Sequence, residues 1–411
     1  MGDERLPIRS QLLLPLLQTI DEAGGQATPR EVYDVLAERV GLPPALRSRT
    51  VCGGAAGTIN AWERQVRNTR QQAAALGLIE NDPAKRRFNL WEITERGAQG
   101  LRNIRHRFLI TIFETESGVC LGGECEVAVE MIASESVDLI ICSPPFPLTK
   151  KKGYGNLEAG EHIEWLVDCA RSWRRILHDR ASVVLALGDA WMPGSPTMQL
   201  YQERLLLRLV DELGYHLAQR FFWENTAKLP SPAEWVTVRR VRVTPSIEPI
   251  YWLSKTNAPK ANNRNVLRPY SESMRRRLKQ GGERASRRPS GHRLAEAAFS
   301  NDCGGSIPHN LLSIPHTASD DMYMRACRER GLPIHPARWP RQLVEFFIDF
   351  LTDPGDTVAD FFGGSGTTGE VAAKRGRRWI TTERVYEYAL GSVARHEGDP
   401  TLRTYYQNLT G

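Results

Sequence analysis

The first part of the chain shows hydrophobic residues at helical spacing and ends in an alternating stretch. Residues 12–20, 32–40 and 60–78 each carry apolar side chains at intervals of three and four. Residues 88–93 alternate apolar and polar positions, as a half-buried strand does. The pattern predicts a small domain of three helices closed by a hairpin, which we place at residues 1–107.

From about residue 108 the pattern changes to short apolar runs separated by amphipathic stretches. Residues 137–142 read as a buried strand, and 161–177 as the helix that follows it. Such alternation predicts an α/β domain at 108–411, with a Rossmann-like parallel sheet covered by helices on both faces. Residues 255–330 lose this rhythm and predict an inserted region. Further elements are expected at 182–187 (strand), 202–213 (helix), 341–351 (helix), 357–361 (strand) and 379–382 (strand).

Charge and composition narrow the classes of function. The net charge is +6 with a pI near 9.0, and basic residues gather between 255 and 293, where the only acids are Glu272 and Glu283. This run fits an irregular DNA-facing segment, with a solvated loop as the alternative. No apolar stretch is long enough to cross a membrane. The seven cysteines lack a Cys-x-x-Cys pair and the histidines are dispersed, so we expect reduced thiols in a cytoplasmic protein and no metal.

A glycine-rich segment predicts a cofactor site. It directly follows a predicted strand and opens a helix, so glycines allow a ligand to approach the backbone near a helix terminus. Glu383 lies 20 residues after Gly363, a spacing at which a carboxylate reaches both ribose hydroxyls. The same geometry suits NAD, which is the alternative cofactor at this point. The segment comprises Asp360, Phe361, Phe362, Gly363, Gly364, Ser365, Gly366, Thr367 and Thr368.

The tetrapeptide Ser143, Pro144, Pro145 and Phe146 follows the buried strand 137–142 and predicts a catalytic site. Consecutive prolines stiffen the backbone, so the Ser143 hydroxyl and the Pro144 carbonyl can act as two fixed acceptors for an exocyclic amine. The amine lone pair can then be aimed at a methyl sulfonium without a strong base. Phe146 offers an aromatic face to a base taken out of the duplex. A rigid turn without chemistry is the alternative interpretation.

Together these motifs resemble the beta-class amino-methyltransferases of DNA, which use S-adenosylmethionine, and among them PvuII-type cytosine-N4 modification enzymes. The resemblance spans about 122–396. It includes these matching segments: 143–146, 150–157, 228–235, 288–292, 304–308 and 335–340. In this family, as in this chain, the catalytic motif precedes the cofactor motif, with the target-recognition region between them.

The resemblance implies methyl transfer to cytosine N4 in duplex DNA, with 255–330 reading the target. It also implies that His335, Pro336, Arg338 and Glu124 help to form the cofactor pocket. Two positions depart from the family pattern: Phe361 replaces a frequent Pro, and Glu124 a frequent Asp. Adenine N6 methylation is the alternative chemistry, and a non-catalytic DNA-binding regulator or a nicotinamide oxidoreductase is the alternative class. Cytosine C5 methylation would need a nucleophilic cysteine, which usually follows a proline, and the chain has no Pro-Cys pair.

The first domain follows the winged-helix pattern and resembles the amino-terminal domain of Mrr-type restriction proteins. We expect it to contact DNA, the alternative being a dimerisation or packing module. Expected partners are double-stranded DNA and a cognate restriction endonuclease, in the cytoplasm of a bacterium near its nucleoid, with a homodimer left open. The residues expected to bind DNA are Arg64, Arg67, Arg70, Lys151, Lys152, Arg275, Arg276, Arg277, Arg287 and Arg288.

Overall fold

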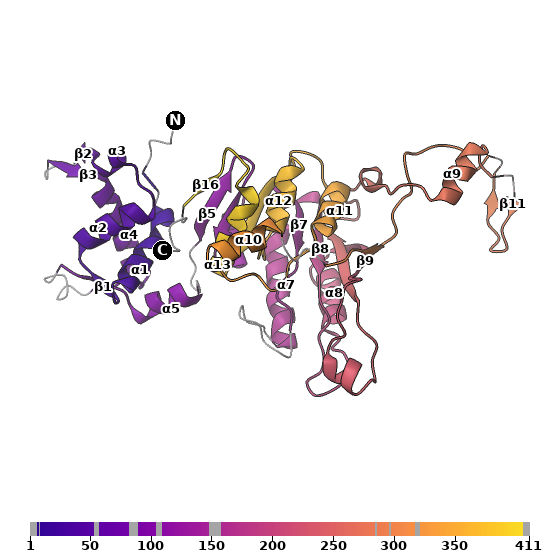
Figure 1. Ribbon diagram of the computed structural model, residues 1–411, viewed down its shortest axis with the longest axis horizontal. Helices are drawn as coiled ribbons and strands as arrows, with labels where there is room; N and C mark the ends of the chain where they lie inside the picture. Colours follow the sequence, from indigo (N-terminus) through magenta and orange to yellow (C-terminus); the bar gives the residue numbers. More distant parts are fainter. Residues whose placement is uncertain are drawn as a thin grey trace.

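The computed structural model shows an elongated molecule with three parts along its long axis (Figure 1). A helical N-terminal domain lies at one end, a large sheet domain in the middle, and a projecting arm at the other end. The structure describes residues 6–7, 9–52, 57–81, 89–103, 109–147, 158–283, 286–295, 297–316 and 321–405.

The N-terminal domain contains the three predicted helices and two small β pairs. Thr28 begins the second helix with a capping box, in which Thr28 and Glu31 satisfy each other's backbone donors. The predicted strand at 88–93 is short and pairs with a strand near Gly25, while the hairpin at 50–60 was not predicted. The elements are α1 (Arg9–Glu22), β1 (Gln26–Ala27), α2 (Pro29–Arg39), α3 (Pro44–Arg47), β2 (Thr50–Cys52), β3 (Thr58–Asn60), α4 (Ala61–Ala75), β4 (Trp91–Glu92) and α5 (Glu95–Asn103).

The middle domain is built on a ten-stranded sheet. In spatial order its strands are β13 (Leu311–Ser313), β9 (His216–Glu224), β10 (Ile247–Ser254), β8 (Leu177–Ala186), β7 (Val137–Cys142), β14 (Thr357–Asp360), β15 (Arg378–Glu383), β6 (Gly118–Gly122), β5 (Ile110–Thr115) and β16 (Arg403–Thr404). The five strands from β8 to β6 are parallel, as predicted, whereas β10, β5 and β16 pair antiparallel to their neighbours. The sheet is therefore mixed. β5 and β6 form a hairpin, and β9 and β10 are an antiparallel pair joined by the long connection 225–246, which contains η3.

Helices cover both faces of this sheet, as the sequence predicts. One face packs against α6, α7 and α8, and the other against α11, α12 and α13, each with its own apolar core. No described helix has the length and apolar character needed to cross a bilayer. The helices are α6 (Cys125–Met131), α7 (Ala159–Ile176), α8 (Tyr201–Asp211), α10 (Met322–Glu329), α11 (Arg341–Leu351), α12 (Thr367–Lys374) and α13 (Tyr386–Ser392), with the short turns η3 (Glu234–Val238), η4 (Asn263–Val266) and η5 (Val393–His396).

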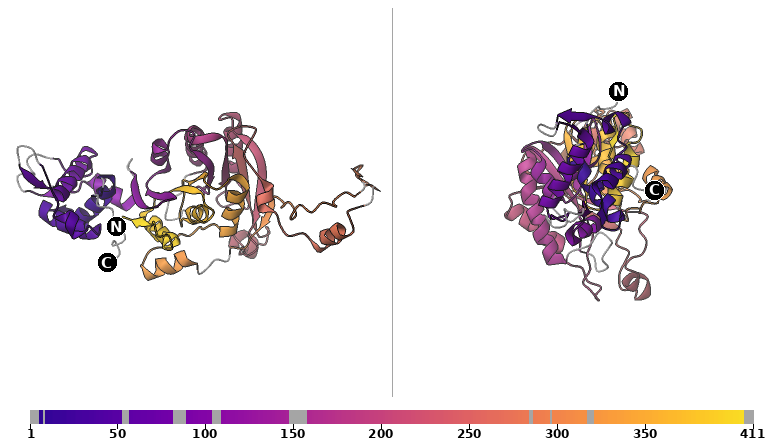
Figure 2. Two further views of the ribbon diagram at one scale, coloured as in Figure 1. Left: turned by 90° about the horizontal axis from the view of Figure 1, so that it is seen from above. Right: turned by 90° about the vertical axis from the view of Figure 1, so that its left-hand side faces the viewer.

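The arm comprises residues 268–306 and projects away from the β13 side of the sheet (Figures 1 and 2). Its two ends are joined where Arg268 and Ser306 exchange backbone hydrogen bonds of 2.9 and 2.8 Å. Beyond this junction it contains α9 (Glu272–Lys279) and a hairpin of β11 (Ser286–Arg287) and β12 (Arg293–Leu294). The matching segment 288–292 forms the turn of that hairpin, where the Arg288 N–H donates to the His292 carbonyl.

The predicted insert at 255–330 is wider than the arm. Lys255 and Lys260 form ion pairs with acids of the sheet domain, among them Asp179 and Asp356. After the arm, β13 returns to the sheet and α10 packs near α13. Of the described residues of this predicted insert, 268–306 stand apart from the domain body (Figure 1).

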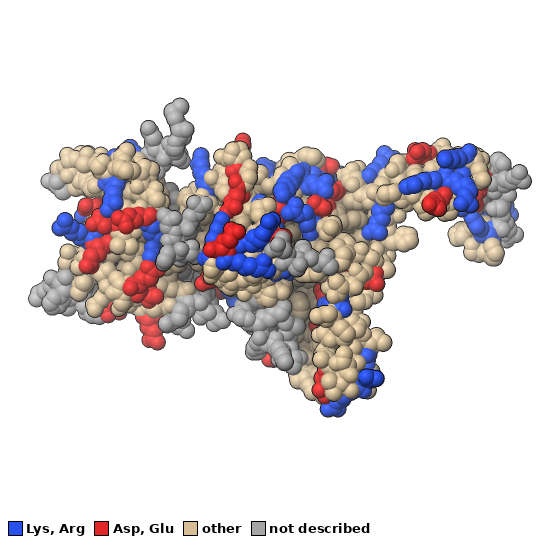
Figure 3. Space-filling view, in the orientation of Figure 1, with Lys and Arg blue, Asp and Glu red and all other residues tan. Residues whose placement is uncertain are grey.

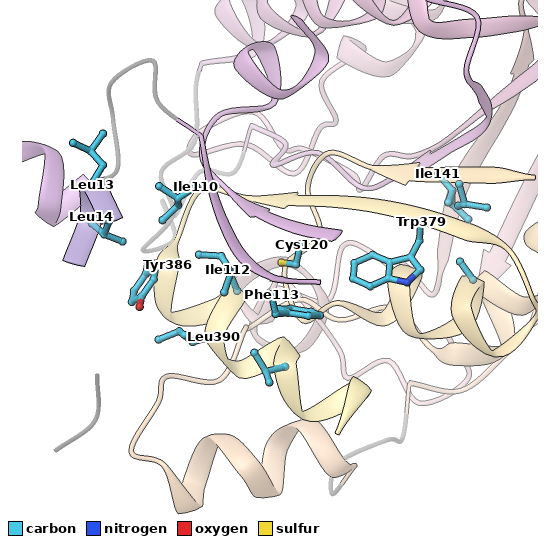
Figure 4. Packing of buried hydrophobic residues seen from close by; sticks show 14 of the residues in the cluster. Leu13, Leu14, Ile110, Ile112, Phe113, Cys120, Ile141, Trp379, Tyr386 and Leu390 are labelled. Carbon is cyan, nitrogen blue, oxygen red and sulfur yellow. The ribbon is translucent and has the colours of Figure 1, made fainter. Parts of the chain in front are cut away.

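The N-terminal domain and the sheet domain share one apolar core. Helix α1 contacts β5, and leucines of α1, including Leu13 and Leu14, belong to the same buried cluster as Ile110 and Ile112 of β5 (Figure 4). All four side chains are at most 1% exposed. Since burial of each such side chain contributes about 1.5 to 3 kcal/mol, the contact fixes the two domains to each other.

Deletion of residues 1–107 should therefore destabilise the sheet domain. Exposure of about two isoleucine side chains costs about 3 kcal/mol, which lowers the melting temperature by about 5 °C in a domain of this size. Thermal unfolding of the truncated and full-length chains measures this shift. The double variant Arg64→Gln/Arg67→Gln, which changes only exposed charges, serves as the control and should melt within about 1 °C of the parent. An unchanged melting temperature after deletion would contradict the shared core.

Candidate active site

The two motifs lie at the carboxyl ends of adjacent parallel strands. Strand β14 pairs with β7 through Val358 and Leu139, and with β15 through Asp360 and Thr381. Continuation of the first register places Ser143 beside the start of the glycine loop. The catalytic tetrapeptide, the glycine loop and the end of β15 therefore lie together at the carboxyl ends of the parallel strands. This is where open α/β sheets bind their ligands.

The tetrapeptide packs against the end of β8. Pro144 is buried, while Ser143, Pro145 and Phe146 are partly exposed. The Phe146 ring lies on Gly188, where an added Cβ would come within 2.4 Å of the ring. The Gly188 carbonyl accepts hydrogen bonds from the Tyr201 hydroxyl and from the Gln202 amide, the latter at 2.9 Å. A glycine at 188 thus makes room for the aromatic ring, which the sequence did not indicate.

A buried histidine lies behind the tetrapeptide. His162 of α7 is fully buried and close to the Pro145 backbone, with Trp165 and Tyr201 as ring neighbours. Burial lowers the pKa of His162 to about 4, so the imidazole is neutral at physiological pH. It packs beneath the catalytic loop as an uncharged side chain.

Hydrogen bonds from Asp360 hold the glycine loop. One carboxylate oxygen accepts from the Phe362 N–H at 3.0 Å and the other from the Thr368 hydroxyl at 2.6 Å. Burial raises the pKa of Asp360 to about 6, against the opposing effect of these two bonds. The Ser365 and Thr367 hydroxyls lie 3.2 Å apart inside the loop. Asp360, Ser365, Thr367 and Thr368 therefore shape the loop from within.

The glycines of the loop have different reasons to lack a side chain. Gly364 has φ +51°, and an added Cβ would lie 3.1 Å from the His335 ring. Gly366 has φ +73° and caps α12, where a Cβ would lie 2.6 Å from Cβ of Ser392. Gly366 thus serves helix packing, so a bulky residue there would disturb the fold before it reached a ligand. A Cβ at Gly363 would approach the Thr382 carbonyl to 3.2 Å.

The two phenylalanines of the loop point into different surroundings. Phe361 is 2% exposed and stacks on Trp173 of α7 at 5.9 Å. Its side chain belongs to the core and packs beneath the loop. Phe362 is partly exposed and meets Trp165 edge-on at 5.5 Å.

Glu383 ends β15 with both carboxylate oxygens turned to the loop backbone. They accept from the Gly364 N–H at 2.8 Å and from the Val385 N–H at 2.7 Å. Burial raises the pKa of Glu383 to about 7. Each carboxylate oxygen has a second lone pair that can accept from a ligand hydroxyl. Glu124 lies next to this site, because the Gly123 N–H donates to the Glu383 carbonyl at 3.0 Å.

The segment before α11 lies against the glycine loop. His335 stacks edge-on with Tyr388 at 4.6 Å, and its Nδ1 lies 2.5 Å from the Ala337 carbonyl. Arg338 donates to the His335 carbonyl at 3.0 Å, whereas Pro336 is exposed. His335 thus lies beside the glycine loop, and Arg338 holds the backbone of this segment through its hydrogen bond to the His335 carbonyl.

Sequence reasoning missed a buried ion-pair network that supports the loop. Arg395 of η5 pairs with Glu370 and with Asp321, each at 2.9 Å, and its Nε donates to the Ser365 carbonyl at 2.6 Å. Burial opposes ionisation of Glu370, but Lys374 and two arginines lower its pKa overall. Glu370 follows the glycine motif directly. Its partner Arg395 is 25 residues away, and no local pattern marks it.

The predicted DNA-binding residues fall into three groups. On α4, Arg64 and Arg67 are exposed, whereas Arg70 donates to the Glu80 carbonyl at 2.6 Å. In the arm, Arg275 and Arg276 are exposed. Two further arm residues are engaged within the arm: Arg277 and Arg288 both pair with Glu283, and Arg277 also lies over Phe299. Arg287 lies on β11, and its side chain, like Lys151 and Lys152, is outside the described residues.

Comparisons with known proteins agree with this geometry. A family model described as DNA methylase matches residues 137–393, more than half of the chain. The chain belongs to this DNA methylase family. A second model, the Mrr N-terminal domain, matches residues 10–103 of the methylase. Both resemblances predicted from the sequence are thereby confirmed.

Individual relatives cover most of the sheet domain and arm. The Type II methyltransferase M.PvuII of Proteus hauseri is 42% identical over 285 residues, 69% of this chain and 84% of its own. M.BglII of Bacillus subtilis is 24% identical over 68% of each chain. A solved structure described as PvuII DNA methyltransferase (cytosine-N4-specific) is 37% identical, with a TM-score of 0.56, and covers 68% of this chain and 86% of that one.

S-adenosylmethionine is the methyl donor of the methylase, and the pocket fits it. Gly363 and Gly364 leave bare backbone on the loop, and Glu383 has free acceptor capacity for two ribose hydroxyls.

Affinity for S-adenosylmethionine should depend on pH through Glu383. The ionised carboxylate accepts from the ribose hydroxyls, and protonation below its pKa of about 7 removes this acceptor. Binding should therefore be about tenfold weaker at about pH 6 than at about pH 8. Calorimetric titration at both pH values measures the ratio. Glu383→Gln should bind S-adenosylmethionine more weakly, and its affinity should be the same at both pH values. If this variant kept the tenfold difference between the two pH values, another group would be responsible for it.

Proposed function

We propose that this methylase transfers a methyl group from S-adenosylmethionine to N4 of cytosine in double-stranded DNA. The observation that carries the proposal is the Ser-Pro-Pro-Phe tetrapeptide at the end of β7, directly beside the cofactor loop at the end of β14. The similarity to M.PvuII and to the cytosine-N4-specific structure supports the same base. Intact catalytic and cofactor motifs argue against a purely DNA-binding role.

The chemistry follows from two neutral acceptors and an aromatic face. S-adenosylmethionine supplies an electrophilic methyl group. The Ser143 hydroxyl and the Pro144 carbonyl accept from the N4 amine and favour the geometry in which its lone pair points toward that methyl group. Phe146, held on Gly188, supports the flipped base. As the N4–methyl bond forms, the bond between the methyl group and the sulfonium sulfur would break and leave a neutral thioether. The amine would take the positive charge and then release a proton to solvent.

Ser143 distinguishes the two candidate bases. A serine hydroxyl is uncharged and rotates its own proton away, so it can accept from a cytosine amine without placing a fixed charge in the site. The family tends to place Asp at this position in adenine enzymes. The relative YhdJ, a DNA adenine methyltransferase of Escherichia coli, is only 23% identical to this chain. Cytosine is therefore the proposed base.

The arm and the N-terminal domain are the proposed DNA contacts outside the active site. Basic side chains gather on the arm around α9 (Figure 3), where Arg275 and Arg276 are exposed. We propose that 268–306 reads the target sequence and that α4 contacts adjacent phosphates through Arg64 and Arg67. Within a bacterial cytoplasm, nucleoid DNA would be the substrate. The Type II class of these relatives fits a cognate restriction endonuclease, and a homodimer is an alternative to a monomer.

Loss of the Ser143 hydroxyl should reduce catalysis far more than cofactor binding. Ser143→Ala should lower kcat about 100-fold or more, because the lost hydrogen bond matters most while the nitrogen becomes tetrahedral. Its dissociation constant for S-adenosylmethionine should stay within about threefold. Single-turnover methylation and calorimetry measure the two quantities. Ser172→Ala, at an exposed position on α7, is the matched control and should keep full activity.

The methylated base identifies the substrate directly. Nucleoside mass spectrometry of duplex DNA treated with the parent enzyme should show N4-methylcytosine, which Ser143→Ala should reduce and Ser172→Ala should not. N6-methyladenine alone would overturn the choice of base while leaving the acceptor mechanism in place. The absence of any methylated nucleoside would favour the non-catalytic regulator.

Neutralisation of the exposed arm arginines should weaken the salt dependence of DNA binding. Each phosphate contact contributes about 0.9 to the slope of log affinity against log salt, so Arg275→Gln/Arg276→Gln should lower the slope by about 2. Fluorescence anisotropy across a salt series measures the slope. The control Arg171→Gln/Arg378→Gln removes equal charge from exposed positions on the body of the sheet domain, on α7 and at the start of β15, and should leave the slope unchanged. A slope for Arg275→Gln/Arg276→Gln that equals the slope of the parent would mean that the arm is only a solvated loop.

A further inference from the structure

Two cysteines and a glutamate meet between α6 and α7, on the face of the sheet covered by α6, α7 and α8. The Cys125 and Cys169 sulfur atoms lie 3.6 Å apart. One Glu126 oxygen lies 3.2 Å from the Cys125 sulfur, and the other lies 3.7 Å from the Cys169 sulfur. Both thiols are buried, at 4% and 2% exposure. No local sequence pattern indicates this cluster, because the two cysteines are 44 residues apart.

The sulfur–sulfur separation matches that of two ligands around one tetrahedral zinc ion, and each sulfur lies near a different oxygen of Glu126, one of which would be the third ligand. Zinc bonds of about 2.3 Å to sulfur and about 2.1 Å to oxygen place tetrahedral sulfur atoms about 3.8 Å apart, and sulfur and oxygen about 3.6 Å apart. The three donor atoms of Cys125, Glu126 and Cys169 all lie within 4.8 Å of one another. We propose that these three residues form a zinc site that holds α6 against α7.

The donor chemistry selects the type of ion. Two thiolates favour a soft or borderline cation such as Zn²⁺ and disfavour Mg²⁺ and Ca²⁺, which prefer oxygen ligands. Binding replaces the two thiol protons, which pass to solvent, and the carboxylate is the third ligand. Glu126 is more exposed than the thiols, so a water molecule on its side completes the tetrahedron.

A hydrogen bond already orients the carboxylate ligand. The Trp165 indole N–H donates to Glu126 Oε1 at 2.6 Å, the kind of outer contact that fixes metal ligands. The Trp165 ring also meets Phe362 of the cofactor loop. Helix α6 begins directly after Glu124, beside the end of β15. The zinc ion would thus stiffen one wall of the cofactor pocket, although it lies outside the reacting groups.

Cobalt is a direct probe of the site in the full-length protein. After treatment with a chelator and desalting, Co²⁺ titration should produce a thiolate charge-transfer band and the visible bands of tetrahedral cobalt, saturating at about one equivalent, and Zn²⁺ should abolish them. Cys169→Ser and Cys125→Ser should each lose most of the charge-transfer intensity. Cys303→Ser, which removes an exposed thiol of the arm, is the matched control and should retain it.

A stability measurement tests the same site independently of the spectra. Zinc at about 100 times its dissociation constant should raise the melting temperature of the parent and of Cys303→Ser by about 4 °C, and should leave Cys169→Ser unchanged. Metal-free melting of each variant verifies that it folds. The absence of cobalt bands and of a zinc-dependent shift in the parent would show that the cluster is only a hydrogen-bonded pair of thiols. Bands that depend on Cys303 instead would also overturn the proposal.

Discussion

The position of β14 between β7 and β15 is the constraint on which the active site depends. Parallel pairing aligns the carboxyl ends of these strands, so the tetrapeptide, the glycine loop and Glu383 meet at one edge although 240 residues separate Ser143 from Glu383. The Asp138 carboxylate reinforces the alignment by accepting from the Thr357 N–H at 2.9 Å. A shift of one residue in either ladder would move the methyl donor relative to Ser143, and proximity catalysis tolerates little such displacement.

The glycine loop carries few side chains of its own, so the surrounding structure must hold it. Asp360 binds it from inside, Glu383 binds the Gly364 N–H, and Arg395 binds the Ser365 carbonyl. A buried ion pair such as Arg395–Glu370 adds little net stability, because desolvation offsets the attraction. The ion pair instead positions the loop, because it holds the Arg395 guanidinium where its Nε can donate to the Ser365 carbonyl, out of reach of competing water.

The sequence predicted the elements whose signals are local. The apolar run before Ser143 and the strand before Gly363 are both present, because buried parallel strands need consecutive apolar residues and a tight loop needs glycine. It failed where partners are distant. The stacking of Phe361 on Trp173 and the roles of Arg395 and Gly188 arise only in the tertiary structure. The arm begins and ends where Arg268 and Ser306 exchange backbone hydrogen bonds, and no local sequence signal marks this contact between residues 38 positions apart.

The two proposed DNA-contacting parts are attached to the sheet domain in physically different ways. The N-terminal domain joins through buried leucines and isoleucines, and a dry apolar contact resists rotation because any displacement exposes surface to water. The arm joins through a single isolated bridge of two backbone hydrogen bonds at its base, between Arg268 and Ser306, and no described residue of the arm belongs to either apolar core. Backbone hydrogen bonds near solvent exchange readily with water, so less free energy is needed to reorient the arm than the N-terminal domain. A change of orientation to fit a DNA target therefore costs least free energy at the Arg268–Ser306 junction. The active site and the N-terminal domain would move together as one body.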